Sequence, residues 1–115
     1  MNKRIMDTAF APAGKGKVKV DFRPFEGRSK LEVEVEKVPP GTVFELFLEN
    51  PDGGQLEKAG ELIASGAGEA EIEFETEDRA LLPFGVPAVN VFFGRPLEVR
   101  LPGGAVKFRG TVPTP

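Results

Sequence analysis

Short segments in which apolar and charged residues alternate strictly are the feature that most constrains this chain. Residues 17–23 place an apolar side chain at every second position with charged side chains between, and residues 30–37 repeat the pattern. A period of two puts successive side chains on opposite faces of a β-strand. Gly or Pro interrupts almost every longer stretch, so no segment keeps the apolar spacing of an amphipathic helix. The sequence therefore predicts an all-β protein.

Other segments carry the same signal and are separated by turn-forming residues. Seven or eight short strands at this spacing predict a single antiparallel β-sandwich, or a flattened barrel, over residues 17–115. Residues 1–16 precede the first clear strand and are predicted to be an N-terminal arm. The further expected strands are 42–49, 55–65, 69–76, 88–93, 96–101 and 105–112.

Two hairpins follow from the pattern, because apolar and oppositely charged residues then face one another. A two-residue turn at Glu26 and Gly27 joins the first pair of strands, and a turn at Gly103 and Gly104 joins the last pair. The first turn predicts the pairs Phe22–Leu31, Val20–Val33, Val18–Val35, Lys19–Glu34 and Lys17–Glu36. The second predicts the pairs Leu101–Val106, Val99–Phe108 and Glu98–Arg109.

The predicted core consists of the residues on the apolar side of each strand. It comprises Val18, Val20, Phe22, Leu31, Val33, Val35, Phe44, Leu46, Leu48, Ile72, Phe74, Val99, Leu101, Val106 and Phe108.

The absence of Cys, His, Trp and Tyr excludes most catalytic chemistry. Without His or Cys the chain has no imidazole base, no thiolate nucleophile and no nitrogen or sulfur ligand for a transition metal. The glutamates recur at every second position, which is typical of a solvated strand face. We therefore expect no enzyme activity, no catalytic residues, no cofactor and no transition-metal site.

Calcium is the one metal that this residue inventory suits, because it binds oxygen ligands alone. The candidates are Asp52, in the turn formed by residues 50–54, and the group Glu75, Glu77 and Asp78. Neither has the spacing of an EF-hand, so each predicts at most a weak calcium site.

Charge is distributed unevenly along the chain, although the net charge is only −3. Residues 1–30 hold eight basic and three acidic side chains, residues 31–78 two and fourteen, and residues 79–115 five and one. One interpretation is that basic strands fold back against acidic strands within the domain. The other is head-to-tail attraction between copies.

A basic stripe on the first strand raises the question of nucleic-acid binding. Lys15, Lys17, Lys19 and Arg23 form this stripe, but the strand that follows is acidic. We interpret the stripe as one side of a set of cross-strand salt bridges and expect no nucleic-acid partner.

Two segments carry apolar residues outside the predicted strands. The arm contains Ile5, Met6 and Phe10, and the irregular segment after residue 76 contains Leu81, Leu82 and Phe84. Exposed apolar clusters commonly mark contact sites. We therefore predict that these six residues form an interface, with Thr8, Ala9 and Phe10 extended against another subunit.

The sequence gives few clues to localisation. No apolar run approaches the length of a membrane span, and residues 1–10 lack the apolar region of a signal peptide. We expect no membrane insertion. A cytoplasmic protein and a part of a larger extracellular or particle assembly both fit.

Two stretches resemble chordin-type (CHRD) domains. The C-terminal one runs from Val89-Asn90-Val91 to a Pro102-Gly103-Gly104 turn and an Arg109-Gly110-Thr111-Val112 strand, and the N-terminal one covers residues 14–31 and the turn at 39–42. The resemblance implies an extracellular-type β domain of interaction. The family's histidines are absent: Phe92 follows Val91, and the strand at 44–48 has none.

These observations predict a non-enzymatic structural or assembly subunit that acts through β-domain surface contacts and its arm. The expected partner is another copy of the chain, as a homo-oligomer, or another protein. The alternative is a monomeric extracellular-type binding or adhesion module resembling a CHRD domain.

Overall fold

The computed structural model describes residues 2–8, 14–76 and 82–115, which form eight antiparallel strands in one nearly closed sheet. The all-β prediction, a sandwich or flattened barrel, is confirmed. Among these residues the helical segments are three short 3-10 turns, η1 (Pro24–Glu26), η2 (Pro83–Gly85) and η3 (Val89–Phe92). The strands are β1 (Asn2–Thr8), β2 (Lys15–Arg23), β3 (Arg28–Glu36), β4 (Val43–Glu49), β5 (Leu56–Ile63), β6 (Ala70–Glu75), β7 (Pro96–Arg100) and β8 (Val106–Thr111).

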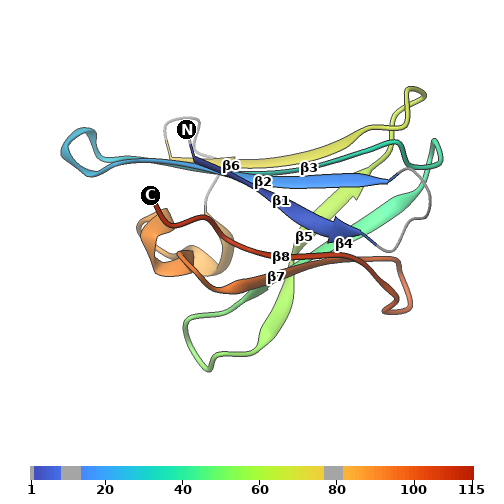
Figure 1. The fold of residues 1–115 in the computed structure, drawn as a ribbon. Helices are drawn as coiled ribbons and strands as arrows, with labels where there is room; N and C mark the ends of the chain where they lie inside the picture. Colours follow the sequence, from blue (N-terminus) through green and yellow to red (C-terminus); the bar gives the residue numbers. More distant parts are fainter. Residues whose placement is uncertain (1, 9–13, 77–81) are drawn as a thin grey trace.

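The sheet divides into two halves that β1 joins. The strand order is β5-β4-β7-β8-β1-β2-β3-β6. We call β1, β2, β3 and β6 the first half, and β4, β5, β7 and β8 the second half. Residues 2–6 pair with β2, whereas Asp7 and Thr8 pair with β8. Figure 1 shows β1 passing from the layer that holds β2 and β3 toward β8.

Part of the segment predicted as a separate arm is therefore a strand of the sheet, with hydrogen-bonded neighbours on both sides. Thr8, expected against another subunit, pairs with Phe108 of its own chain. Ala9 and Phe10 lie outside the described residues. The sequence pattern did not predict this strand, because Ile5 and Met6 are adjacent apolar residues and break the alternation.

The opposite seam brings together the two end strands of the sheet, β5 and β6. A Cβ atom added to Gly60 on β5 would lie 2.4 Å from Ile72 Cδ1 and 3.6 Å from Phe74 Cζ on β6. Glycine thus lets β5 pass closely over the side chains of β6, and side-chain packing closes this seam.

The β2–β3 hairpin is formed as predicted, but its register differs from the predicted one by two residues. Val18 pairs with Val33 and Val20 with Leu31. The predicted two-residue turn is wrong, because Pro24–Glu26 form η1 and Gly27 adopts φ 65°. Four residues therefore connect the strands. A shift of two leaves every side chain on its predicted face.

The β7–β8 hairpin has the predicted pairs Val99–Phe108 and Glu98–Arg109. The predicted pair Leu101–Val106 is wrong. The register shifts between Val99 and Arg100, so Val106 instead lies opposite Arg100.

Residues 88–93 do not form the expected strand. Val89–Phe92 form η3, with Val89 and Phe92 buried. A short apolar run has no periodicity that separates a strand from a helical turn, and the i, i+3 spacing of these two residues suits a 3-10 turn.

The core lies between the two halves and contains most of the predicted residues. Phe44 and Phe108, from the second half, pack edge to face with ring centroids 6.2 Å apart. The predicted residues Phe22, Ile72, Phe74 and Leu101 pack against the core while part-exposed, and Val106 is also part-exposed. The buried apolar residues outside the predicted core list are Met6, Val38, Leu62, Ala64, Ala70, Leu82, Val89, Phe92, Leu97 and Val112.

Candidate functional site

The predicted interface residues occupy different environments. Met6 and Leu82 are buried in their own subunit, and Phe84 is half-buried with its ring centroid 6.3 Å from that of Phe92. Phe10 and Leu81 lie outside the described residues. Ile5, by contrast, is 67% exposed. Of the predicted residues that the structure describes, Ile5 thus presents the most apolar surface to a partner.

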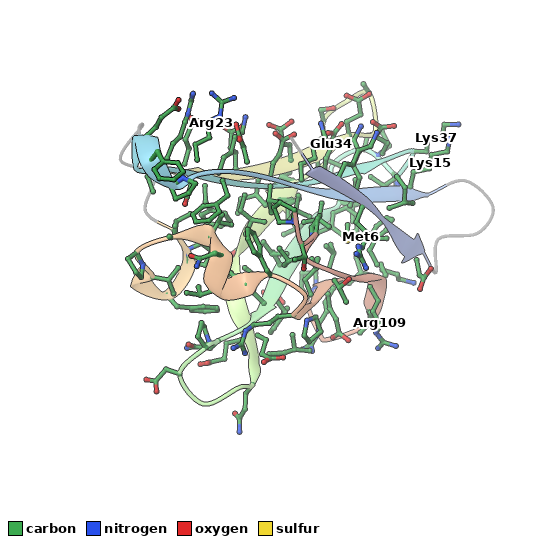
Figure 2. All side chains as sticks on the ribbon, turned by 60° about the vertical axis from the view of Figure 1, so that its left-hand side comes forward. Met6, Lys15, Arg23, Glu34, Lys37 and Arg109 are labelled. Carbon is green, nitrogen blue, oxygen red and sulfur yellow. The ribbon has the colours of Figure 1, made fainter. Side chains whose placement is uncertain are left out.

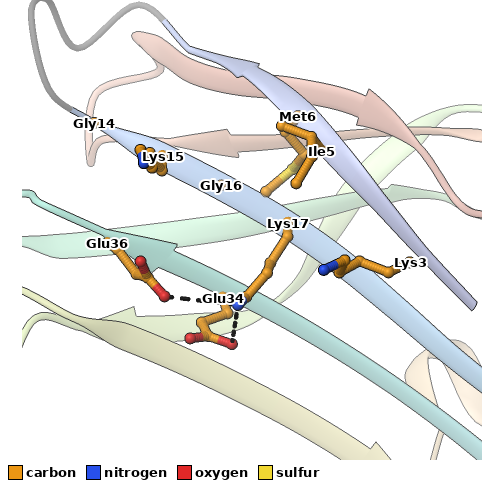
Figure 3. Close-up of a pocket in the computed structure, with 9 residues that line it drawn as sticks. All are labelled: Lys3, Ile5, Met6, Gly14, Lys15, Gly16, Lys17, Glu34 and Glu36. Carbon is orange, nitrogen blue, oxygen red and sulfur yellow. Dashed lines mark ion pairs between the residues drawn. The ribbon is translucent and has the colours of Figure 1, made fainter. Parts of the chain in front are cut away.

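Ile5 borders a groove of about 420 Å³ on the outer face of the first half (Figure 3). The register places Ile5 opposite Lys17, and Met6 opposite Gly16. Figure 2 shows Met6 on the inner side of β1, whereas Lys15 extends outward at the end of β2. The groove is lined by Lys3, Ile5, Met6, Gly14, Lys15, Gly16, Lys17, Glu34 and Glu36.

Gly16 determines how closely β1 and β2 approach the core beneath this groove. A Cβ atom there would lie 2.7 Å from both Met6 Cε and Phe108 Cδ1. Glycine therefore allows Met6 and Phe108 to fill the space under β2. The groove floor is consequently the packed junction of the two halves.

Cross-strand ion pairs cover the outer face next to the groove. Lys17 Nζ lies 3.6 Å from carboxylate oxygens of both Glu34 and Glu36. Lys19 Nζ lies 3.5 Å from those of Glu32 and Glu34. Desolvation would lower the pKa of Lys19, but the two carboxylates outweigh it and raise the pKa. The interpretation that basic strands fold against acidic strands within the domain is confirmed.

Two lysines of the groove stand apart from this pairing. Lys3 and Lys15 are exposed. Within residues 2–8, 14–76 and 82–115, neither forms an ion pair. At the rim of the groove, the described part of the chain therefore leaves these two positive charges without an ion-pair partner.

Carboxylates crowd the other side of the same face, where β3 meets β6. One oxygen from each of Glu32, Glu71 and Glu73 can lie within 4.8 Å of the others. Burial, followed by repulsion from Glu32, Glu34 and Glu73, raises the pKa of the Glu71 carboxyl. Sequence reasoning missed this group because it depends on the pairing of β3 with β6, although alternating glutamates in both strands were visible.

Two of the predicted calcium ligands, Asp52 and Glu75, lie in the described part of the chain. The Asp52 backbone N–H donates to Asn50 Oδ1 at 2.9 Å, as in an ordinary turn. Glu75 Oε1 lies 3.3 Å from Arg28 Nη2, which competes with a cation for this carboxylate. Glu77 and Asp78 lie outside the described residues.

In the second half, the Glu98 carboxyl has a lowered pKa, in contrast to the raised pKa of Glu71. Glu98 is 7% exposed and accepts hydrogen bonds from Arg100 Nη2 at 2.7 Å and from Arg109 Nε at 3.0 Å. Burial would raise the pKa of Glu98, but the two guanidinium groups outweigh burial and lower it. The Arg100 guanidinium also lies 3.9 Å from the ring centroid of Phe47. Each charged group of this network therefore has a partner, although two guanidinium groups share one carboxylate.

Comparison with known proteins adds no family assignment. No family model matches the chain, and no curated protein matches it. The resemblance to chordin-type domains therefore stays a prediction. Among the described residues, none of the helices is long and apolar enough to span a membrane.

Proposed function

We propose that this chain is a non-enzymatic structural subunit that associates with other copies through the groove beside Ile5. The observation that carries the proposal is the position of Ile5. It is 67% exposed and borders a groove of about 420 Å³ on a face otherwise covered by charged side chains. Removing a largely exposed isoleucine from water is favourable, by up to about 1.5–3 kcal/mol for full burial.

The surroundings of the groove favour a protein surface as the partner. Lys17, Glu34 and Glu36 are already held by ion pairs on one side. Lys3 and Lys15 remain to meet acidic groups of a partner. An apolar centre with a polar rim is the usual arrangement of a protein–protein contact.

The chemistry of the carboxylates supports the non-enzymatic part of the proposal. A pair of carboxylates that hydrolyses glycosides needs one group with a raised pKa and a second at a defined distance around a substrate. Glu34 and Glu98 are instead paired with lysine or arginine on the outer faces of the sheet. Glu71 has a raised pKa and lies near Glu32 and Glu73, but these three residues are not among those that line the groove.

Sedimentation equilibrium over a range of protein concentrations tests the proposal. We expect the average mass of the unaltered chain to rise with concentration and that of Ile5→Lys to remain monomeric. Ile63→Lys is the matched control, because Ile63 is 65% exposed on β5 in the other half of the sheet. We expect it to associate like the unaltered chain.

A monomeric unaltered chain at the highest concentration would contradict the proposal. The monomeric binding or adhesion module would then be the better account. Equal loss of association in Ile5→Lys and Ile63→Lys would show that the groove is not the contact site.

A further inference from the structure

We propose that the element entering the groove is the tip of the β2–β3 hairpin of a second copy, with Phe25 as the inserted side chain. This inference rests on the proposed function and names the partner surface. Phe25 is fully exposed at this tip. An aromatic side chain held in water gains most from a contact that buries its ring.

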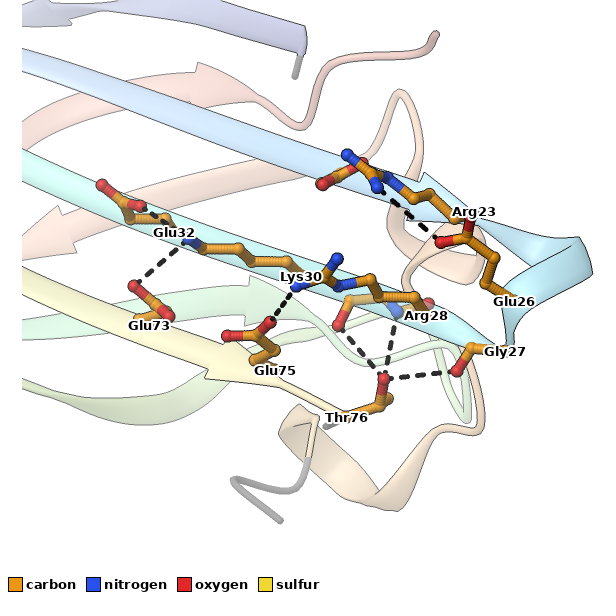
Figure 4. Close-up of polar contacts among 11 residues, drawn as sticks. Arg23, Glu26, Gly27, Arg28, Lys30, Glu32, Glu73, Glu75 and Thr76 are labelled. Carbon is orange, nitrogen blue, oxygen red and sulfur yellow. Dashed lines mark hydrogen bonds and ion pairs between the residues drawn. The ribbon is translucent and has the colours of Figure 1, made fainter. Parts of the chain in front are cut away.

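The tip holds Phe25 in a defined position. Pro24 begins η1, and the Gly27 N–H donates to the Pro24 carbonyl oxygen at 3.2 Å. Figure 4 shows the hairpin end next to Thr76, the residue that follows β6, whose hydroxyl donates to the Gly27 carbonyl oxygen at 3.4 Å. Arg23 and Glu26 form a further ion pair at 3.7 Å. Ordering the tip in advance lowers the entropy lost on binding.

The groove has the size and chemistry for a phenyl ring. A cavity of about 150 Å³ is enough to bind benzene, and the groove measures about 420 Å³. Ile5 supplies apolar contact, and the ammonium groups of Lys3 and Lys15 can approach the face of an aromatic ring. Glu26, next to Phe25, pairs with Arg23 but keeps 61% of its side chain exposed, so a lysine of the rim can share this carboxylate.

The tip and the groove lie at opposite ends of β2, so one molecule is unable to satisfy both. β2 contains nine residues, which span about 30 Å at the usual rise of a strand. In Figure 1 the hairpin tip projects from the far end of the layer that holds β1 and β2. Each copy would offer one tip and one groove to different neighbours. Such unlike contacts build rings or filaments.

Two variants that each lose one partner surface test this arrangement. Phe25→Ala keeps the groove and removes the inserted ring, whereas Ile5→Lys keeps the tip and blocks the groove. We expect each variant alone to associate at least about tenfold more weakly than the unaltered chain. An equimolar mixture should form a one-to-one dimer, because exactly one intact tip and one intact groove remain.

Thermal unfolding of both variants checks that they fold, which the exposure of both side chains favours. A mixture that stays monomeric, or Phe25→Ala that associates like the unaltered chain, would overturn the tip assignment. If Ile5→Lys alone loses association, the groove stands and the tip is wrong. If the unaltered chain never associates, both proposals fail.

An exposed aromatic side chain at a hairpin tip could also contact a membrane, and the same variants distinguish this. Binding of the unaltered chain to vesicles containing phosphatidylserine, lost in Phe25→Ala while the chain stays monomeric, would overturn the inference.

Discussion

The two halves of the sheet differ in how the charged side chains on their outer faces are paired. In the second half Glu98 is enclosed by Arg100 and Arg109, so each charged group of this network has a partner. In the first half the lysines of β2 pair with glutamates of β3, but Lys15 remains at one side and Glu71 is crowded at the other. A surface whose charged groups already have partners gains little from a further contact. The first half is therefore where a partner can gain most, and it also carries the groove and the hairpin tip.

The largest expected effect is at the junction of the halves. Gly16→Val would bring a Cβ atom within 2.7 Å of the Phe108 ring, which is buried and has no room to move. We expect a loss of about 1–3 kcal/mol in the free energy of unfolding, measured by urea denaturation. Gly60→Val is the comparison, and its closest contact is the mobile end of Ile72. We expect Gly60→Val to lower the free energy of unfolding by less than Gly16→Val does. A larger loss for Gly60→Val would contradict the packing described.

The next prediction compares Glu98, on the outer face of the second half, with Glu71, on the outer face of the first half, because their pKa values shift in opposite directions. The pKa of Glu98 is lowered below 4.5, so its ionised form stabilises the fold above the ordinary pKa, and this contribution is lost as the pH falls through the folded-state value. The pKa of Glu71 is raised, so its ionised form destabilises the fold, and acidification through the folded-state pKa relieves this.

Glu98→Gln should therefore lower stability at pH 7, whereas Glu71→Gln should raise it. Both differences should shrink at acidic pH, as measured by urea denaturation at pH 7 and pH 3. A change of the same sign for both variants at pH 7 would show that the two faces do not differ in this way.

The smallest effect concerns the unpaired lysines of the groove. Replacing Lys3 and Lys15 together by Gln should weaken self-association by about two- to fivefold and reduce its dependence on salt, because exposed charge pairs contribute little and are screened. Lys58→Gln is the control, since Lys58 is paired with Glu45 in the second half. Association is measured at low and at high salt. If the double variant associates like the unaltered chain at both, these lysines do not contribute to self-association.

The alternating sequence pattern predicted the strands and their buried faces better than it predicted which residues pair across neighbouring strands. Val18, Val20 and Val33 reached the core although the hairpin register was wrong by two residues, because an even shift keeps the faces. Strand β1 was missed, since Ile5 and Met6 are adjacent. Residues 88–93 gave no periodicity to separate a strand from the 3-10 turn that forms.

The candidate site was less accessible to sequence reasoning than the fold. Ile5 was identified as a contact residue, but the groove exists only because β1 pairs with β2 across residues distant in sequence. Phe25 was noted only as an aromatic residue next to the basic stripe of the first strand and was not predicted to be a contact residue. Its exposure follows from the longer connection that Pro24 and Gly27 create.

Isoleucine methyl NMR tests the central claim most directly. The chain has three isoleucines, of which Ile5 borders the groove, Ile63 is exposed on β5 and Ile72 packs against the core. In a sample labelled at the isoleucine δ1 methyl groups, raising the protein concentration should change the chemical shift of Ile5, while the signals of Ile63 and Ile72 keep their positions and broaden only as the assembly grows. Three signals that stay constant over the whole range, or a change confined to Ile63, would contradict self-association through the groove.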